Sequence, residues 1–345
     1  MVSPEAGLPL HVDYVAEGEG DVAEAIAYVL EVIGRPANAT ILAVTTLAVL
    51  AFVAGYLRVR PFRRDLAVLR EALTEYRDLV PWLLRISLGM PLVGAGFAGY
   101  YFSPAVAVDA RLLQVSLGFL LLFGLATRTV ALAAVVAYLA AVPVYPRILL
   151  ANEFVGGLLA VALLGGGRPS ADHVLKRVAD APGTVYGRVD PVARFADRFQ
   201  AWIRPYRRFL PTLVRATLGV AFLSLGVGEK LLQPGPALTV VAKYDLTAVV
   251  PVAPGLWVVG AGLAETAVGL ALLAGLFTRA TAGVAFTLFT LTLFALPDDP
   301  VLAHLSLYGL VSVLVITGGG PYSLDRRWFG TRDVPESDRG SPAPS

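Results

Sequence analysis

Long apolar tracts alternate with short polar segments along the whole chain. Each tract approaches the roughly 20 mostly apolar residues that an α-helix needs to cross a bilayer. The pattern therefore predicts an all-α integral membrane protein with about nine transmembrane helices. The predicted spans are residues 39–57, 80–101, 110–126, 129–145, 148–166, 210–229, 255–277, 280–297 and 300–318.

The composition agrees with a membrane protein and excludes several kinds of chemistry. Charged residues make up 16% of the chain, whereas a typical soluble protein has about 25%. The absence of cysteine excludes disulfides, thiolate metal sites and a thiol nucleophile. Only one of the three histidines, His304, lies in an apolar tract, so this chain alone offers no bis-histidine haem site. We find no zinc spacing, nucleotide loop, hydrolase triad or nucleic-acid-binding module, and we expect no metal and no nucleic-acid partner.

The positions of the charged residues predict the orientation in the plasma membrane. Arginine and lysine concentrate in segments 58–79 and 167–209, whereas Asp109, Asp298 and the acidic segment 1–38 fall on the other side if every tract spans. Positively charged loops stay in the cytoplasm. We therefore expect an external N-terminus and a cytoplasmic C-terminus, although a few basic residues (Arg111, Arg147 and Lys243) fall on the outer side.

Three groups of residues occur twice and in the same order. The pattern YR…P-x-L-x-R-x-x-LG of 76–89 returns at 206–219, G-x-x-L-x-x-GL-x-TR of 118–128 returns at 269–279, and GGG-x-x-S-x-D of 165–172 returns at 318–325. Chance similarity between apolar helices would not align proline, arginine, serine and aspartate. The chain is thus predicted to hold two four-helix units, and an even number of spans per unit makes them parallel repeats.

An amphipathic segment precedes each predicted unit, and we expect it to lie in the cytoplasmic interface. Anchoring is the simpler role for these segments, while a regulatory lipid or partner site stays open. The predicted organisation is an extracytoplasmic segment 1–38, a single transmembrane helix 39–57, an amphipathic linker 58–79, a first and degenerate unit 80–172, a basic amphipathic linker 173–209, a second unit 210–325 and a cytoplasmic tail 326–345.

The second unit resembles the DoxX family of four-helix membrane proteins. The residues that carry the resemblance are Arg215-x-x-Leu-Gly219, Gly226-x-Gly228-x-Lys230, Glu265, Gly269…Thr-Arg279, His304 and Gly318-Gly-Gly320…Ser323-Leu-Asp325. The resemblance implies a four-helix membrane fold and an association with quinone-linked oxidation of sulfur compounds or with membrane oxidoreductase complexes. Quinone is the cofactor that it implies, and any other electron carrier must come from a partner subunit.

Four ionisable residues of the second unit form the candidate site. An ionisable group in hydrocarbon is costly unless it is paired or hydrated, so such residues are functional candidates. Glu265 is the deepest of them, Glu229 and Lys230 end the preceding helix, and His304 begins the last one. We expect Lys230 and Glu265 to form an ion pair with His304 nearby.

The corresponding positions of the first unit carry neutral residues. These are Gly99, Tyr100, Gln114 and Ala151, the last beside Asn152 and Glu153. The sequence therefore places the site in the second unit. Segment 230–254 forms either a lid over it or an interfacial helix without a ligand role.

The remaining repeated polar residues are expected to have structural roles. We expect the arginines (Arg85, Arg128, Arg215 and Arg279) to be topology anchors that contact lipid headgroups. The serine and aspartate of each glycine-rich end (Ser170, Asp172, Ser323 and Asp325) are expected to cap helix termini.

Three functional hypotheses remain open. The first is a subunit or accessory protein of a quinone-linked membrane oxidoreductase system. The second is a transporter of protons or small solutes that uses Glu265 and Lys230. The third is a structural membrane protein without chemistry, in which the ion pair only fixes the register of two helices.

Overall fold

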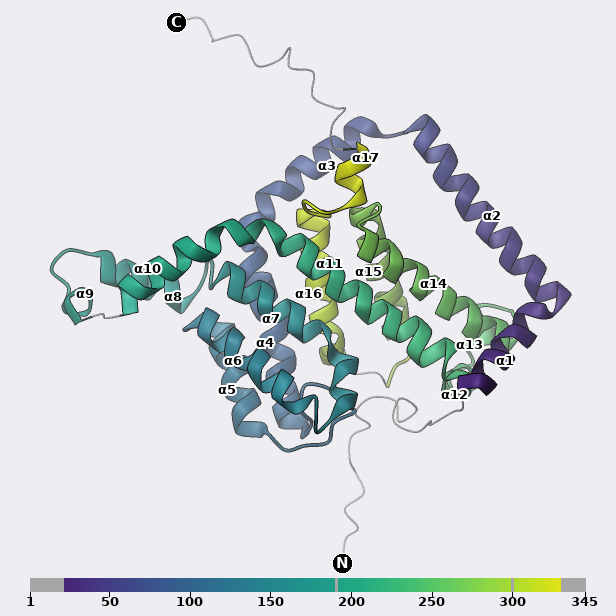
Figure 1. The fold of residues 1–345 in the computed structure, drawn as a ribbon, viewed down its shortest axis with the longest axis horizontal. Helices are drawn as coiled ribbons and strands as arrows, with labels where there is room; N and C mark the ends of the chain where they lie inside the picture. The colour runs from purple at the N-terminus through teal and green to yellow at the C-terminus, as the bar shows by residue number, and fades with distance from the viewer. Residues whose placement is uncertain (1–21, 190–191, 299–300, 330–345) are drawn as a thin grey trace, which may run out of the picture.

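The computed structural model describes residues 22–189, 192–298 and 301–329 (Figure 1). The parts of the predicted N-terminal segment and tail at 1–21 and 330–345 lie outside the described residues. Within the described ranges the chain is helical and has no β-strand. The longer helices are α1 (Val22–Gly34), α2 (Pro36–Val59), α3 (Arg63–Glu75), α4 (Val80–Ala98), α5 (Arg111–Phe123), α6 (Thr127–Ala141), α7 (Glu153–Leu164), α8 (Ala171–Asp180), α10 (Val192–Ile203), α11 (Leu210–Leu223), α12 (Pro234–Lys243), α14 (Pro254–Ala274), α15 (Thr278–Ala295) and α16 (Val301–Thr317).

Short helical segments connect these helices. They comprise η2 (Tyr76–Leu79), η3 (Pro146–Ala151), α9 (Val185–Val189), η4 (Arg204–Phe209), the π-helix η5 (Ser224–Leu231), α13 (Leu246–Val249) and α17 (Leu324–Phe329). The amphipathic linkers are helical, as α3 and α10. Helix α1 packs against α2 and against α14.

Five helical stretches of the described chain are long and apolar enough to cross a membrane. They are Pro36–Val59, Arg63–Ala98, Arg198–Leu231, Pro254–Ala274 and Thr278–Ala295. The protein is therefore an all-helical membrane protein. The helices α5, α6, α7 and α16 are apolar but shorter, so the number of nine spans stays a prediction.

Close crossings between glycines organise each half of the bundle. Gly89 of α4 faces Gly118 of α5, and a Cβ on Gly89 would lie 2.9 Å from the Gly118 carbonyl oxygen. Gly219 of α11 faces Gly269 of α14 in the same way, again at 2.9 Å. Because glycine has no side chain, the backbones approach closely, as is common between membrane helices.

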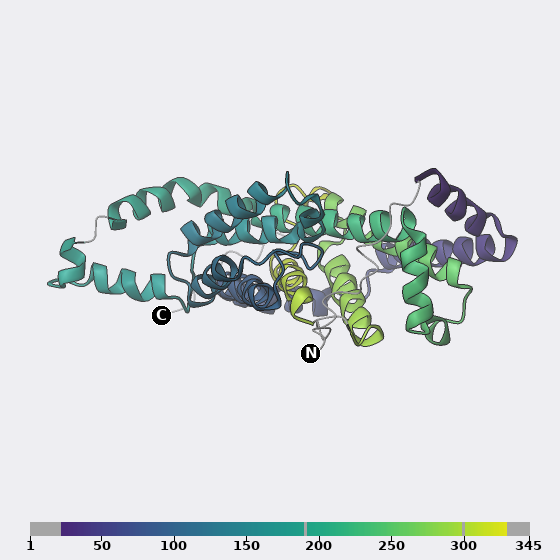
Figure 2. The same cartoon turned by 90° about the horizontal axis from the view of Figure 1, so that it is seen from below.

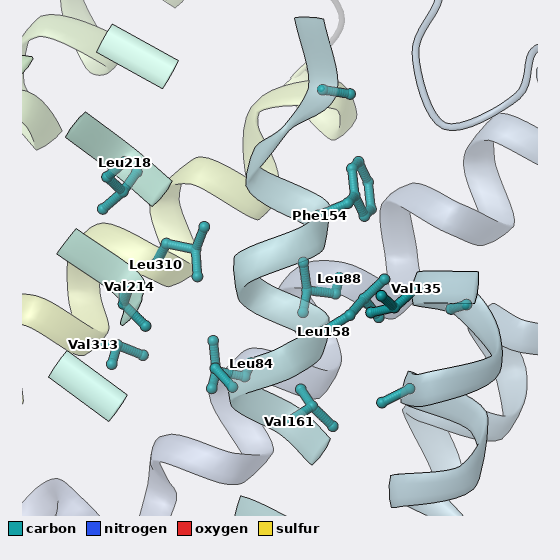
Figure 3. Close-up of a cluster of buried hydrophobic side chains, with 14 of the residues drawn as sticks. Leu84, Leu88, Val135, Phe154, Leu158, Val161, Val214, Leu218, Leu310 and Val313 are labelled. Carbon is teal, nitrogen blue, oxygen red and sulfur yellow. The ribbon is translucent and has the colours of Figure 1, made fainter. Parts of the chain in front are cut away.

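The two halves share one hydrophobic core, which α4, α7, α11 and α16 form (Figure 3). Helix α16 packs on α4, where a Cβ on Gly309 would overlap the hydroxyl of Ser87. Helix α7 packs on α11, where a Cβ on Gly156 would overlap the hydroxyl of Thr217. Buried side chains fill the space between them, among them Leu84, Leu88, Leu158, Val214, Leu218, Leu310 and Val313.

The turns after α5 and α14 are closed by the repeated aspartates. Gly124 and Gly275 end these helices, each with φ of 67°, a conformation that glycine adopts without strain. The Asp172 carboxylate then accepts hydrogen bonds from the Ala126 and Thr127 amides at 2.7 and 2.9 Å. Asp325 does the same for Phe277 and Thr278 at 2.6 and 2.7 Å. The expected capping role is confirmed.

The expected headgroup role of Arg85 and Arg215 is wrong. Arg85 is 1% exposed, and it donates to the carbonyl oxygens of Gly166 and Pro169 at 2.8 and 2.6 Å. Arg215 is 4% exposed and donates to four carbonyl oxygens, those of Leu272, Leu273, Gly319 and Tyr322. The ends of helices leave carbonyl groups without partners, and these buried guanidinium groups satisfy them.

Helix α2 stands apart from the other spans (Figure 1). None of the residues in its most apolar stretch is buried within the molecule. Seen from below, the bundle is broad and thin, with the α1–α2 pair at one end and the helices α8–α10 at the other (Figure 2). Residues of α4, α7, α11, α14, α15 and α16 line one cavity.

Candidate functional site

A cavity of about 650 Å³ lies between the two halves of the bundle. Its lining is mostly apolar. The second half contributes side chains that include Phe222, Trp257 and Phe289, and the first half contributes side chains that include Tyr100, Phe102 and Phe154. The lid segment, α12 with α13, covers the cavity through side chains such as Val240, Val241 and Leu246.

The four candidate residues of the second unit all line this cavity. The Lys230 ammonium lies 2.8 Å from the Glu265 carboxylate, so the predicted ion pair is present. The side chains of Lys230 and Glu265 are 21% and 18% exposed. Glu229 and His304 contribute to the same wall. The second half thus contributes one ammonium group, two carboxylates and one imidazole to the cavity, from η5, α14 and α16.

The π-helix η5 positions Lys230 beside Glu265. A Cβ on Gly226 of η5 would lie 2.7 Å from the Gly262 carbonyl oxygen of α14, so these helices cross closely one turn before the ion pair. A π-helix is rare, and single turns of it occur often at functional sites. The close approach at Gly226 therefore sets the height of the lysine along α14.

Glu153 is a site residue that the sequence did not predict. It begins α7 in the first half, is 6% exposed and lines the cavity. The Ser306 hydroxyl of α16 donates to its carboxylate at 3.2 Å. The candidate site therefore lies between the two units, and its placement within the second unit alone is corrected. The sequence feature that could have predicted Glu153 is a carboxylate at the start of an otherwise apolar helix.

In the first half, the positions that match the candidate site carry neutral residues that contact one another. The Gln114 amide donates to the Tyr100 carbonyl oxygen at 2.6 Å and accepts from the Phe102 amide at 2.9 Å. The Phe102 ring contacts the rings of Tyr138 and Phe154, with centroids 5.3 and 5.4 Å apart. Aromatic side chains thus fill the core beside Gln114, whereas Glu265 faces open space.

A polar contact fastens the lid at the outer end. The Asp298 carboxylate lies 3.1 Å from the Lys243 ammonium and accepts a hydrogen bond from the Tyr244 hydroxyl at 3.0 Å. These two hydrogen bonds, that of Lys243 first, hold the pKa of Asp298 below its usual value. The contact connects the end of α12 to the segment that follows α15, so it joins two borders of the cavity.

Comparison with known proteins identifies the second half. Residues 210–298 match the family model described as DoxX. This part of the chain is a DoxX domain. The DoxX match runs from α11 to the end of α15 and includes Lys230 and Glu265, whereas His304 and Glu153 lie outside it. No curated protein and no solved structure gives a significant match to the chain.

The chemistry of the cavity favours a largely apolar ligand with a polar end. Lys230 is the cation of the lining, which otherwise holds the carboxylates Glu153, Glu229 and Glu265 and the imidazole of His304. The indole N–H of Trp257, another lining residue, has no acceptor among the described residues. The site therefore offers hydrogen-bond donors and proton-binding groups within an apolar enclosure.

Proposed function

We propose that this protein is an accessory membrane subunit of a quinone-linked oxidoreductase system and that its cavity holds a quinone-type ligand. The observation that carries the proposal is the Lys230–Glu265 ion pair on the wall of a mostly apolar cavity of about 650 Å³. Such a cavity is within the usual size range of small-molecule sites, about 300–1,000 Å³.

The residues present fit a quinone. The carbonyl oxygens of a quinone accept hydrogen bonds, and Lys230 and Trp257 supply N–H donors at the cavity. The apolar side chains of α14, α15 and the lid suit the ring and its tail. A bound quinone would supply two-electron redox chemistry. The sequence offers no obvious set of side chains that would bind another redox centre. Glu265 would hold the Lys230 ammonium in place through the ion pair.

Quinone binding is tested with the purified chain in lipid nanodiscs. Added ubiquinone or menaquinone analogue is expected to quench tryptophan fluorescence, and Trp257→Phe should remove most of the quenching. Because a hydrogen bond to a charged donor contributes about 1.5–3 kcal/mol, Lys230→Met should weaken binding by about tenfold or more.

Matched variants make the quinone experiment decisive. Trp82→Phe lies outside the cavity lining and should leave the quenching unchanged. Lys176→Met removes an exposed lysine of α8, outside the cavity lining, and should leave the affinity unchanged. Equal quenching in Trp257→Phe and Trp82→Phe, or equal affinity in all lysine variants, would refute the proposal.

Proton or solute transfer is the second candidate, because carboxylates of both halves, Glu153 and Glu265, face one cavity. It predicts proton-coupled uptake in vesicles that Glu265→Gln abolishes, without quinone binding. A purely structural role predicts instead that Glu265→Gln changes thermal stability and neither of the other readouts.

We also propose that the two halves are copies of one four-helix unit in a protein with nine spans, with the N-terminus outside the plasma membrane. The support is that residues at repeated positions make the same contacts. Gly89 meets Gly118 as Gly219 meets Gly269, and Asp172 caps α6 as Asp325 caps α15. Between the halves, the Gly156–Thr217 and Gly309–Ser87 contacts join equivalent positions in exchanged order.

A further inference from the structure

Two arginines converge on the carboxyl end of α7, whereas the start of this helix lines the cavity. Arg128 of α6 and Arg207 of η4 both donate to the Leu164 carbonyl oxygen, at 3.2 and 3.3 Å. The negative end of the α7 dipole offsets part of their repulsion. The two guanidinium groups share one acceptor, and because this carbonyl oxygen is neutral it does not neutralise their positive charges.

Both guanidinium groups keep donors without acceptors. Arg128 Nη1 and Arg207 Nε are buried and have no hydrogen-bond partner among the described residues. Asp172 interacts electrostatically with Arg128 but its oxygens already accept from Ala126 and Thr127. Within the described chain neither arginine has a carboxylate partner in an ion pair. A buried donor without an acceptor is costly, so an external anion would stabilise this arrangement.

The equivalent arginine of the other half is fully partnered at the end of α16. Arg279 of α15 donates to the carbonyl oxygens of Val315 and Ile316 at 2.9 and 3.1 Å. Arg279 and Arg128 hold the same place in one repeated pattern. Among the described residues Arg279 keeps no buried donor without a partner, in contrast to Arg128.

We propose that the cluster of Arg128 and Arg207 binds the phosphate of an anionic phospholipid headgroup. Guanidinium groups bind phosphate oxygens through paired hydrogen bonds, and two of them can bridge one phosphodiester. The cluster lies at the end of the apolar helix α7, beside η4, which follows the amphipathic helix α10. Trp202 and Tyr206 beside Arg207 are 64% and 45% exposed, as aromatic residues at a membrane interface are.

The experiment measures the thermal midpoint of the full chain in detergent with added lipid. Phosphatidylglycerol is expected to raise the midpoint more than phosphatidylcholine. Arg207→Gln should remove most of this gain. Arg204→Gln is the matched control, because Arg204 is an exposed arginine of the same η4 segment and should keep the full gain.

Native mass spectrometry of the same samples counts the retained lipids. The wild type should keep a phosphatidylglycerol molecule that Arg207→Gln loses. Equal behaviour of Arg207→Gln and Arg204→Gln, or equal gains with the two lipids, would overturn the proposal. A full gain from inorganic phosphate alone would also overturn it, because the site would then bind free phosphate. If Arg207→Gln does not fold, Arg207→Lys keeps the charge but loses the paired donors, and it should keep only part of the gain.

Discussion

The ion pair of Lys230 and Glu265 keeps two charges in a place where either alone would be poorly solvated. Removing one partner of a fully buried pair costs about 3–5 kcal/mol. The side chains of Lys230 and Glu265 keep 21% and 18% of their area exposed, so we expect about 2 kcal/mol for Lys230→Met or Glu265→Gln. Each single variant should lower the thermal midpoint in detergent by several degrees.

The double variant Lys230→Met with Glu265→Gln separates charge from shape. It leaves no unpaired charge, so its midpoint should lie nearer the wild type than that of either single variant. The difference between the double effect and the summed single effects measures the coupling of the pair. Additive losses would show that the two side chains do not interact and would contradict the structure.

Arg215 is expected to be among the most sensitive residues of the second half. Its guanidinium group serves carbonyl oxygens at the ends of α14 and α16. The ammonium of a lysine cannot reach them all, so Arg215→Lys should cost about 3 kcal/mol, given about 1.5–3 kcal/mol for each charged hydrogen bond. Urea or thermal unfolding in detergent measures this cost. Arg208→Lys, at an exposed position, should be neutral, and equal losses in both variants would contradict the assignment.

Single residues show how far a sequence predicts a site. The pairing of Lys230 with Glu265 was predictable because helix positions fix their heights in neighbouring spans. Glu153 was not, because its contact with Ser306 joins residues that are far apart in the chain. The buried state of Arg85 was also missed, since hydropathy counts an arginine as polar and cannot show that helix-end carbonyl groups will solvate it.

At the scale of elements, the glycine crossings determine how closely helices approach. Gly219→Ala would place a methyl group 2.9 Å from the Gly269 carbonyl oxygen. Overpacking of this kind costs about 1–3 kcal/mol, and we expect a corresponding fall in the unfolding midpoint. Gly260→Ala in α14 is the control, because nothing lies within 4 Å of its added Cβ. It should be neutral or stabilising, and a larger loss there than at Gly219 would refute the crossing.

The lid has its own expected response to pH. The pKa of Asp298 is lowered by Lys243 and Tyr244, and that of Lys243 is raised by Tyr244 and Asp298. The contact should therefore persist between the ordinary values of 3.8 for the aspartate and 10.5 for the lysine. It is lost as pH falls through the lowered pKa of Asp298 or rises through the raised pKa of Lys243. Both groups are exposed, so global stability should hardly change.

Acrylamide quenching of a variant that keeps Trp257 as its single tryptophan measures the lid. Quenching should be low at pH 7 and higher at pH 3, because Trp257 lies under the lid segment. Asp298→Asn should show the higher value at both pH values. A variant whose quenching still rises on acidification would show that another group controls the opening.

The order and type of the helices were predictable because apolar length is a strong signal. The predicted span 39–57 corresponds to Pro36–Val59, and 255–277 corresponds to Pro254–Ala274. The helical ends were less predictable, since Gly124 and Gly275 end their helices through left-handed turns that hydropathy does not register. The π-helix at Ser224–Leu231 has no sequence signal of its own.

At the scale of the whole molecule, the cavity depends on both halves being present. The first half contributes Tyr100, Phe102 and Glu153 to its wall, and α16 and α7 exchange contacts across the centre. Aromatic rings fill the core of the first half beside Gln114, whereas the second half supplies Glu229, Lys230, Glu265 and His304 to the cavity. The first half adds the carboxylate of Glu153. The two halves therefore contribute unequally to the candidate site.

The orientation of this architecture is testable because the chain contains no cysteine, so each introduced cysteine is a unique label. Asp109 and Asp180 are exposed, and α5, α6 and α7 lie between them. These helices have 13, 15 and 12 residues. At 1.5 Å per residue, 12 residues give about 18 Å of the roughly 30 Å hydrocarbon core, so they span only with help from their flanking turns. Three crossings place the two positions on opposite sides.

In intact cells, a membrane-impermeant maleimide should therefore label Asp109→Cys directly and Asp180→Cys only after lysis. Both variants change exposed residues, so neither should perturb the fold. Labelling of both from the outside would mean that an even number of these short helices crosses. In that case the predicted nine spans and the parallel repeat would fail together, because both require each four-helix unit to begin and end in the cytoplasm.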